Sequence, residues 1–341
     1  MKAYLIRRLL LIIPTLIGIT FLTFLITRVV PGGPVEQAMM ERQFAGAESG
    51  ISSDRGGARE GLTEEDLAYL NKLYGFDKPL LIAYVDWLGR ILVFDLGESY
   101  RYNEPVADLV LERLPISLYY GLVTTILTYL ISIPLGVLKA VKDKTWIDST
   151  TSALIFTGYA VPAFVLGLLL AVYLGGRLEW FPMSGFTSDE FEDLSFLGQI
   201  GDIIYHSVLP LICYMIGSFA AMSVLMKNSL LENLSADYIR TAYAKGLQPK
   251  RVIYGHALRN SLIPLAASFG NNISLVFMGS YLIERVFNID GLGLLGYQAV
   301  TERDYPVVLG TLFLTSTLFL LGNILSDICL ALVDPRIRFQ G

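Results

Sequence analysis

The stretch ISLYYGLVTTILTYLISIPLGVL, residues 116–138, contains no aspartate, glutamate, lysine or arginine. A helix of about 20 apolar residues is long enough to cross the hydrocarbon core of a bilayer. Five further stretches have the same property, and they are residues 9–27, 149–176, 207–226, 261–283 and 305–326. Because six such runs follow one another, the sequence predicts an all-α polytopic membrane protein with six transmembrane helices.

The composition of the whole chain agrees with this interpretation. Of its 341 residues, 53% are hydrophobic and only 17% are charged, whereas soluble domains carry about 25% charged residues. These values exclude a soluble enzyme, a disordered chain and a disulfide scaffold. The strands of a membrane barrel would alternate in polarity over about ten residues, and the uninterrupted runs do not. The two cysteines, Cys213 and Cys329, lie in or at the end of apolar runs, where cysteine behaves as a small core residue.

Charge segregates between the segments that join the six runs. If the N-terminus lies inside the cell, the inner segments hold fourteen Lys and Arg, and the two short outer loops hold three. The inner segments are residues 1–8, 139–148, 227–260 and 328–341, and the short outer loops are residues 177–206 and 284–304. Positive charge in short loops marks the cytoplasmic side, so both termini are predicted to be cytoplasmic. The first run, about 19 residues long, exceeds the apolar core of a signal peptide, so we expect an uncleaved helix.

The predicted domain organisation has three parts. Residues 1–30 form the cytoplasmic N-terminus and the first transmembrane helix, residues 31–115 form an external segment, and residues 116–341 form a core of five helices. Within the external segment, residues 42–61 have the composition of a mobile loop. Thr63 then begins a capped helix that reaches Gly75, and a second amphipathic helix runs through residues 84–92. The sequence therefore predicts a small helical external domain with a structural role.

The outer loop of residues 177–206 carries a cluster of four acidic side chains, Asp189, Glu190, Glu192 and Asp193. Such a run is usually a solvated face, and docking of a basic partner is the alternative. Pro162 is placed to kink the third run. Asp327, beside the last run, is expected to make a structural pair rather than to relay protons.

The fifth run contains four polar residues at membrane depth, Ser268, Asn271, Asn272 and Ser274. Ser268 and Asn272 share one helix face because they are four residues apart. Polar groups in a membrane helix face protein or water rather than lipid. Hydrogen bonding between helices is the favoured role for these residues, and lining of a translocation path is the alternative.

Residues 227–260 form an inner loop with strong helix signals. Ser235 is predicted to cap a helix that has Asp237 in its first turn and Lys245 near its end. Gly246 suits the stop position, and Pro249 suits the first turn of a second helix, residues 250–260. The small residues Ala242, Ala244 and Gly246 would let another backbone approach closely.

The stretch DYIRTAYAKGLQPKRVIYGHALRNSLIP, residues 237–264, resembles the coupling loop of ABC-transporter permeases of the dipeptide and oligopeptide uptake family. The general pattern of these permeases is E-A-A, three residues, Gly, nine residues and I-x-L-P. Here residues 240–242 occupy the E-A-A positions and Gly246 is the glycine. His256 and Leu258 stand at the I and L positions. Arg259 replaces the proline, as is usual in the peptide branch.

Other segments are similar to the same family, namely residues 3–26, 75–100, 112–115, 283–293, 303–308 and 332–338. Asp290 stands where the family often has proline, which puts the local turn in doubt but not the resemblance. The motif PGGPVEQ, residues 31–37, and the insert at residues 40–62 most resemble the permeases of microcin C and oligopeptide uptake.

The resemblance implies a permease subunit of an ATP-driven importer of dipeptides, oligopeptides or modified peptides in a bacterial inner membrane. Such a subunit forms half of the translocation path, and its loop docks on a cytoplasmic ATPase. The residues implied at that contact are Asp237, Tyr238, Arg240, Thr241, Ala242, Ala244, Lys245, Gly246, Leu247, His256, Leu258 and Arg259.

The resemblance also implies the partners, which are a second homologous permease, two ATP-binding subunits and an external solute-binding protein, and no nucleic acid. The chain contains no G-x-x-x-x-G-K-[ST] motif and no Gly-Lys pair, so ATP and magnesium are expected on partner subunits. No catalytic residue is expected, and no metal site, because the two histidines, His206 and His256, lie 50 positions apart.

The sequence bears on three alternatives to a peptide importer. An ion-coupled secondary transporter would carry ionisable residues near its helix centres, and the six runs contain none. An intramembrane metalloprotease would need a pair of histidines in one helix. An ABC importer of nickel chelates, glutathione or sugars stays open, because an external binding protein usually selects the substrate of these systems.

Overall fold

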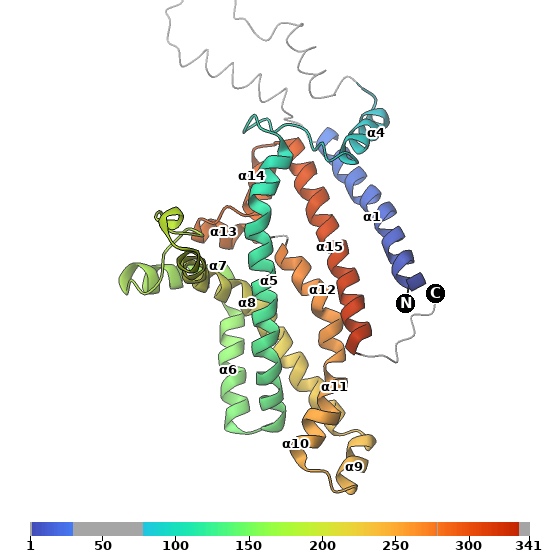
Figure 1. The fold of residues 1–341 in the computed structure, drawn as a ribbon, viewed down its shortest axis with the longest axis vertical. Helices are drawn as coiled ribbons and strands as arrows, with labels where there is room; N and C mark the ends of the chain where they lie inside the picture. The colour runs from blue at the N-terminus through green and yellow to red at the C-terminus, as the bar shows by residue number, and fades with distance from the viewer. Residues whose placement is uncertain (1, 30–77, 278, 334–341) are drawn as a thin grey trace, which may run out of the picture. The chain divides into compact units, whose positions relative to one another are not determined.

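The computed structural model describes residues 2–29, 78–277 and 279–333 (Figure 1). Within these ranges the chain is helical, apart from turns and one isolated antiparallel bridge between Glu98 and Pro105. The chain divides into two compact units. The larger unit comprises Met1–Ile12, Arg113–Leu294 and Thr315–Gly341, and the smaller comprises Ile13–Glu112 and Leu295–Leu314.

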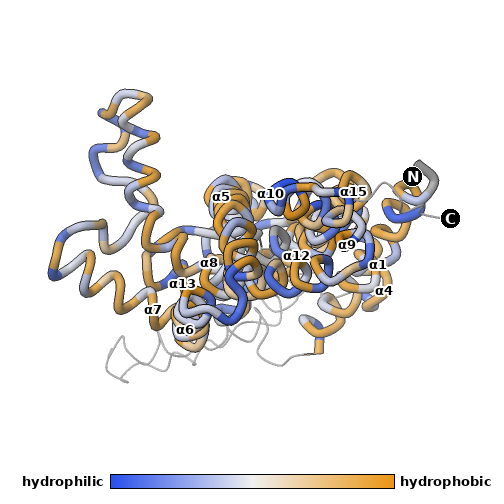
Figure 2. Tube along the Cα trace, turned by 90° about the horizontal axis from the view of Figure 1, so that it is seen from below, coloured by the Kyte–Doolittle hydropathy of each residue, from blue (hydrophilic) through white to orange (hydrophobic). Residues whose placement is uncertain are grey.

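Four of the described helices are long and apolar enough to cross a membrane. They are α1 (Lys2–Val29), α5 (Val106–Val141), α8 (Phe196–Leu234) and α15 (Tyr305–Val333). In Figure 2 most of the trace is orange or white, and strong blue is concentrated in short segments such as α10 (Pro249–Val252). The prediction of an all-helical polytopic chain is therefore confirmed.

The third apolar run forms a broken pair rather than one kinked helix. The segments α6 (Trp146–Ala160) and Ala163–Arg177 meet at an angle of 95°. The second segment consists of α7 (Ala163–Leu170) and the π-helical η1 (Ala171–Arg177). Val161, with ψ 125°, is extended because the ring of Pro162 disfavours the helical conformation in the preceding residue. If this pair crosses as one unit, the described chain has five candidate spans.

The fifth apolar run forms α12 (Ile263–Phe277), which has 15 residues. That is shorter than the roughly 20 residues a crossing requires, so the count of six crossings stays a prediction. The remaining described elements are α4 (Leu80–Ile91), η2 (Phe191–Asp193), α9 (Asp237–Ala244), η3 (Ile253–Ala257), α11 (Leu258–Ser261), α13 (Tyr281–Phe287) and α14 (Leu292–Thr301).

In the smaller unit, α4 packs on the second half of α1. The hydroxyl of Tyr84 lies 2.9 Å from that of Thr20, and the rings of Tyr84 and Trp87 contact the ring of Phe24. These contacts confirm the amphipathic helix predicted through residues 84–92. The predicted helix from Thr63 to Gly75, and the motif and insert at residues 31–62, lie outside the described residues.

The larger unit contains two apolar clusters. One surrounds Tyr120 and Phe287 and includes Cys213, which is 1% exposed, as expected of a core cysteine. The other cluster joins the C-terminal parts of α5 and α8 to the segments that follow α8, and we call it the inner cluster. Its buried members are Val137, Ala140, Met222, Met226, Leu230, Ile239, Ala242, Val252, Ala257 and Leu265.

Glu284 organises the turn between α13 and α14. Its carboxylate accepts hydrogen bonds from the backbone N–H of Ser280 at 3.0 Å, the backbone N–H of Leu294 at 2.5 Å and the hydroxyl of Tyr214 at 3.2 Å. Burial raises the pKa of Glu284, and the three donors oppose this shift. A methyl group on Gly291 would lie 2.7 Å from the carboxyl carbon, so glycine is needed for the close approach.

Asp327 makes the structural pair that was expected of it. Its carboxylate lies 3.2 Å from Arg8 Nε and accepts a hydrogen bond from the hydroxyl of Tyr4 at 3.2 Å. The acidic residues at 189, 190, 192 and 193 are exposed to solvent, in agreement with the solvated face predicted for them.

Candidate coupling site

The candidate coupling segment, residues 237–261, follows α8 after two residues. The predicted cap is wrong, because Ala236 rather than Ser235 occupies the N-cap position of α9. Ser235 keeps helical backbone angles as the C-cap residue that follows α8, and its hydroxyl donates to the carbonyl of Glu232 at 2.7 Å. An N-cap residue needs an extended backbone, which Ala236 has with ψ 150°. Asp237 lies in the first turn, as predicted.

Gly246 ends the first helix, as the sequence predicts. Its φ of +80° lies in the left-handed region, and its N–H donates to the carbonyl of Tyr243 at 2.9 Å. An added Cβ would meet no atom within 4 Å, so backbone conformation rather than space favours glycine here. Pro249 is at the start of α10, also as predicted.

Residues 249–261 are helical throughout, but the expected regular helix contains a wide turn. The helix α10 passes into the π-helical η3 and then into α11. A π-turn widens the backbone hydrogen bond to i→i+5 and rotates the residues that follow it. His256 lies in this turn and is exposed, as is Arg259, whereas Leu258 packs against the inner cluster.

The coupling segment is anchored to α8 and α5 by apolar side chains. Ile239, Val252 and Ala257 are fully buried in the inner cluster. Ala242, 7% exposed, lies in the same cluster and so faces the chain's own core. Of the three small residues expected to admit another backbone, Ala244 and Gly246 are the exposed ones.

The outer surface of the coupling segment is polar. Its exposed members among the implied contact residues are Asp237, Tyr238, Arg240, Thr241, Ala244, Lys245, Gly246, His256 and Arg259, whereas Leu247 is partly buried. Arg240 lies 3.4 Å from Asp237, and their side chains are 74% and 95% exposed. An ion pair this exposed contributes about 0–1 kcal/mol, so breaking it to pair either charge with a partner would cost little free energy.

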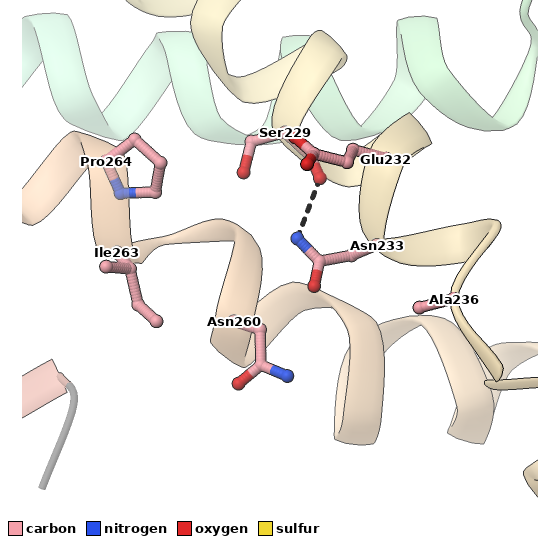
Figure 3. Close-up of a pocket in the computed structure, with 7 residues that line it drawn as sticks. All are labelled: Ser229, Glu232, Asn233, Ala236, Asn260, Ile263 and Pro264. Carbon is pink, nitrogen blue, oxygen red and sulfur yellow. Dashed lines mark hydrogen bonds between the residues drawn. The ribbon is translucent and has the colours of Figure 1, made fainter. Parts of the chain in front are cut away.

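Tyr238 ties the two helices of the segment to α8. Its hydroxyl donates to Asn233 Oδ1 at 2.7 Å and accepts a hydrogen bond from Asn260 Nδ2 at 3.1 Å. Beside these residues lies an open hollow of about 380 Å³ (Figure 3). It is lined by Ser229, Glu232, Asn233, Ala236, Asn260, Ile263 and Pro264, and the Asn233 amide donates to the carbonyl of Ser229.

Two of the four candidate path residues in α12, Ser268 and Asn272, have side chains that the structure describes. Asn272 is 8% exposed and donates to the hydroxyl of Tyr129 on α5 at 3.1 Å, which supports hydrogen bonding between helices. Ser268 donates to the carbonyl of Pro264 within its own helix. The side chains of Asn271 and Ser274 lie outside the described part of the structure.

Sequence reasoning missed four charged residues that the structure brings together where α5 ends, α6 begins and α8 nears its C-terminal end. Lys139, Asp143, Asp148 and Lys227 form a group of linked ion pairs. In the sequence they lie in segments expected to be loops, where charge marks solvent exposure. The one available signal was that Lys139, Asp148 and Lys227 directly adjoin apolar runs, without an intervening residue.

Comparison with known proteins identifies the family. The family model described as binding-protein-dependent transport system inner membrane component matches residues 132–339. The chain is 42% identical to the peptidoglycan transport system permease protein YejB of Agrobacterium fabrum, covering 100% of this chain and 99% of that protein. It is also 42% identical to the inner membrane ABC transporter permease protein YejB of Escherichia coli O157:H7, covering 100% of both.

Two further relatives extend the comparison. The oligopeptide transport system permease protein AppB of Bacillus subtilis is 37% identical and covers 99% of this chain and 100% of its own. A solved structure of the MetNI methionine ABC transporter in an inward-facing form matches with a TM-score of 0.51. This match covers 66% of this chain and 96% of that chain at 18% identity, so it supports the fold alone. The chain therefore belongs to the binding-protein-dependent transport system inner membrane component family, whose members are the non-catalytic membrane subunits of ABC importers.

Proposed function

We propose that the chain is the permease subunit of an ATP-driven importer of oligopeptides or peptide-containing cell-wall fragments. The observation that carries this proposal is the full-length identity of 42% to two YejB permeases, one of which is named for peptidoglycan transport. Relatives named for oligopeptide and dipeptide transport, at 37% and 35% identity, support the same class of substrate. Nickel chelates, glutathione and sugars are the alternative substrates.

The proposed partners are two ATP-binding subunits, a second homologous permease and an external solute-binding protein. The coupling segment is suited to an ATPase contact because a polar, exposed surface lies on a base of buried apolar side chains. Only two residues separate its first helix from α8, a helix of 39 residues. A force applied to α9 therefore reaches a membrane-length helix through a short connection.

The proposed topology has six crossings and cytoplasmic termini, with residues 31–115 outside. The fifth crossing would combine α11 and α12, which are separated by Leu262 alone. Backbone hydrogen bonds from Leu262 to Leu258 and from Ala266 to Leu262 continue the helix across this junction. At 1.5 Å per residue, this helix is about 30 Å long, and Arg259 at its start would lie at the cytoplasmic interface rather than in the hydrocarbon core.

A single substitution tests the coupling role. Valine at Gly246 would be strained, because a β-branched residue at a φ of +80° is disfavoured, although its Cβ would meet no atom within 4 Å. We expect Gly246→Val to weaken co-purification of the ATPase subunits and to lower peptide uptake at least tenfold. The matched control is Gly255→Ala in the same segment, where the added Cβ lies 4.0 Å from the nearest atom. Unchanged ATPase binding and uptake in Gly246→Val would refute the coupling role.

A test of the substrate class needs a transport assay with the complete assembly. Proteoliposomes that contain both permeases, the ATPase subunits and the binding protein would be supplied with labelled oligopeptide, muropeptide, nickel chelate, glutathione or sugar. We expect ATP-dependent accumulation of the oligopeptide or muropeptide. Accumulation driven by an ion gradient without ATP would instead support a secondary transporter.

A further inference from the structure

We propose that Lys139, Asp143, Asp148 and Lys227, here called the charge clamp, make the α5–α6 hairpin move with the coupling segment. This inference rests on the proposed function, because it concerns how motion at the ATPase contact is distributed. Lys139 is in the last turn of α5, and Asp143 is in the turn that follows. Asp148 is in the first turn of α6, and Lys227 is on α8.

Two of the three ion pairs of the charge clamp cross from the hairpin to α8. Lys227 Nζ lies 2.6 Å from Asp148 Oδ2 and 2.9 Å from Asp143 Oδ1. Lys139 Nζ lies 3.3 Å from Asp148 Oδ1 and donates to Ser152 Oγ at 2.5 Å. Two lysines therefore balance two aspartates, and Asp148 is shared between the two lysines.

Burial makes these pairs sensitive to geometry. The side chain of Asp148 is 9% exposed, and that of Lys227, its partner on α8, is 17% exposed. A buried charge is tolerated only while its partner stays within hydrogen-bonding distance. Separation of the hairpin from α8 would leave uncompensated charge out of water, so the pairs oppose relative motion of these helices. Apolar contacts alone are not directional and permit sliding.

The charge clamp lies close to the coupling segment. Lys227 precedes Asp237 by ten positions, about 15 Å along a helix. Beside this stretch, Met226 and Leu230 of α8 pack in the inner cluster with Ile239 of α9 and Val137 of α5. Figure 1 shows α9 and α10 at the same end of this unit as the turn between α5 and α6.

A close helix crossing adds to this attachment. A methyl group on Gly136 of α5 would lie 2.5 Å from the Cβ of Met226 on α8, so the two helices approach closely there. The inner cluster and the charge clamp therefore hold the hairpin on α8 by apolar contact and by ion pairs. At its far end α6 reaches the break at Val161 and Pro162, so movement of the coupling segment can reach the broken span.

The decisive variant removes the link but keeps charge balance. Lys227→Met alone leaves two aspartates against one lysine. Adding Asp143→Asn restores neutrality and retains the pair of Lys139 with Asp148, both of which the hairpin supplies. The double variant therefore separates a coupling role from a need for charge compensation. The control is Lys142→Met, an exposed lysine of the same hairpin for which the described part of the chain records no ion pair.

The experiment uses the complete assembly in proteoliposomes and measures peptide uptake, basal ATP hydrolysis and ATP hydrolysis stimulated by the loaded binding protein. We expect the double variant to assemble, to keep basal hydrolysis, and to lose at least fivefold in peptide taken up per ATP. Lys227→Arg, which retains the charge, should recover most of this ratio, and Lys142→Met should keep the wild-type value.

Two outcomes are distinguishable failures. A wild-type ratio in the double variant would overturn the charge clamp and leave the proposed function intact. Absence of ATP-dependent uptake in the wild-type assembly would refute the proposed function and the charge clamp together. If the double variant does not assemble, Lys227→Gln with Asp143→Asn decides, because glutamine also removes both ion pairs to α8 but keeps a polar group beside Asp148. A wild-type ratio in that variant would again overturn the proposal.

Discussion

The packing of α12 on α15 leads to a sharp prediction for Gly270→Ala. An added Cβ on Gly270 would overlap the backbone oxygen of Gly322 and lie 2.7 Å from the Cβ of Ser326. Small residues at this spacing let two membrane helices approach until their backbones touch. Beside the contact, the hydroxyl of Ser326 donates to the carbonyl of Ala267 at 2.5 Å. The methyl group can be accommodated only if the two helices separate.

The expected cost of Gly270→Ala follows from three effects. Overpacking of a tight contact costs about 1–3 kcal/mol. Loss of the Ser326 hydrogen bond costs about 1 kcal/mol. Alanine in place of glycine favours a helix by about 1 kcal/mol, which offsets part of the loss. The net destabilisation is therefore about 1–3 kcal/mol, or a fall in the unfolding midpoint of about 1–4 °C for a chain of 341 residues.

Thermal unfolding of the purified permease complex, followed by intrinsic fluorescence in one detergent, measures this cost. The control is Gly217→Ala in α8, where an added Cβ meets nothing within 4 Å, and we expect its midpoint to be equal to or above that of wild type. If Gly270→Ala unfolds at the same temperature as Gly217→Ala, the close packing of α12 on α15 is refuted.

Three further predictions concern single side chains. Glu284→Ala leaves three donors without their acceptor, and we expect a loss of about 3 kcal/mol, measured as a lower unfolding midpoint; a midpoint equal to wild type would contradict the role of this carboxylate. Ile239→Asp places a charge in the inner cluster, so limited proteolysis should cut within residues 237–261, whereas the exposed Arg240→Ala should resist cleavage like wild type. Asp327→Asn breaks an ion pair with a side chain of Arg8 that is 44% exposed, so stability should change by about 1 kcal/mol or less. Peptide uptake should also persist in Asp327→Asn, and its loss would indicate proton relay.

Local signals in the coupling segment predict the backbone conformation correctly where a few neighbouring residues determine it. Gly246 adopts the left-handed conformation that the stop position requires, and Pro249 begins the next helix. Ser235 shows the limit of such signals. A serine two positions before an acidic residue resembles an N-cap, but α8 extends to Leu234 and Ser235 is its C-cap.

The direction in which a side chain faces depended on packing. The sequence predicts that the small residue Ala242 is exposed to a partner. It is buried instead, because α9 lies on the inner cluster. Lys139 and Lys227 read as loop charges, yet both pair with Asp148. Lys227 and Asp148 are 79 positions apart, so a local sequence pattern of one helix length cannot include both.

The sequence by itself determined the helical class, the membrane-length runs, the place of the bend at Pro162 though not its 95° angle, and the turn at Gly246. Each follows from the length of an apolar run or from the backbone preference of one residue, which are local properties. Only the tertiary structure decided which charges are buried, how the carboxylate of Glu284 is enclosed and which face of α9 remains exposed. These depend on which helices lie side by side, and the free energy of that packing is shared among residues far apart in the chain.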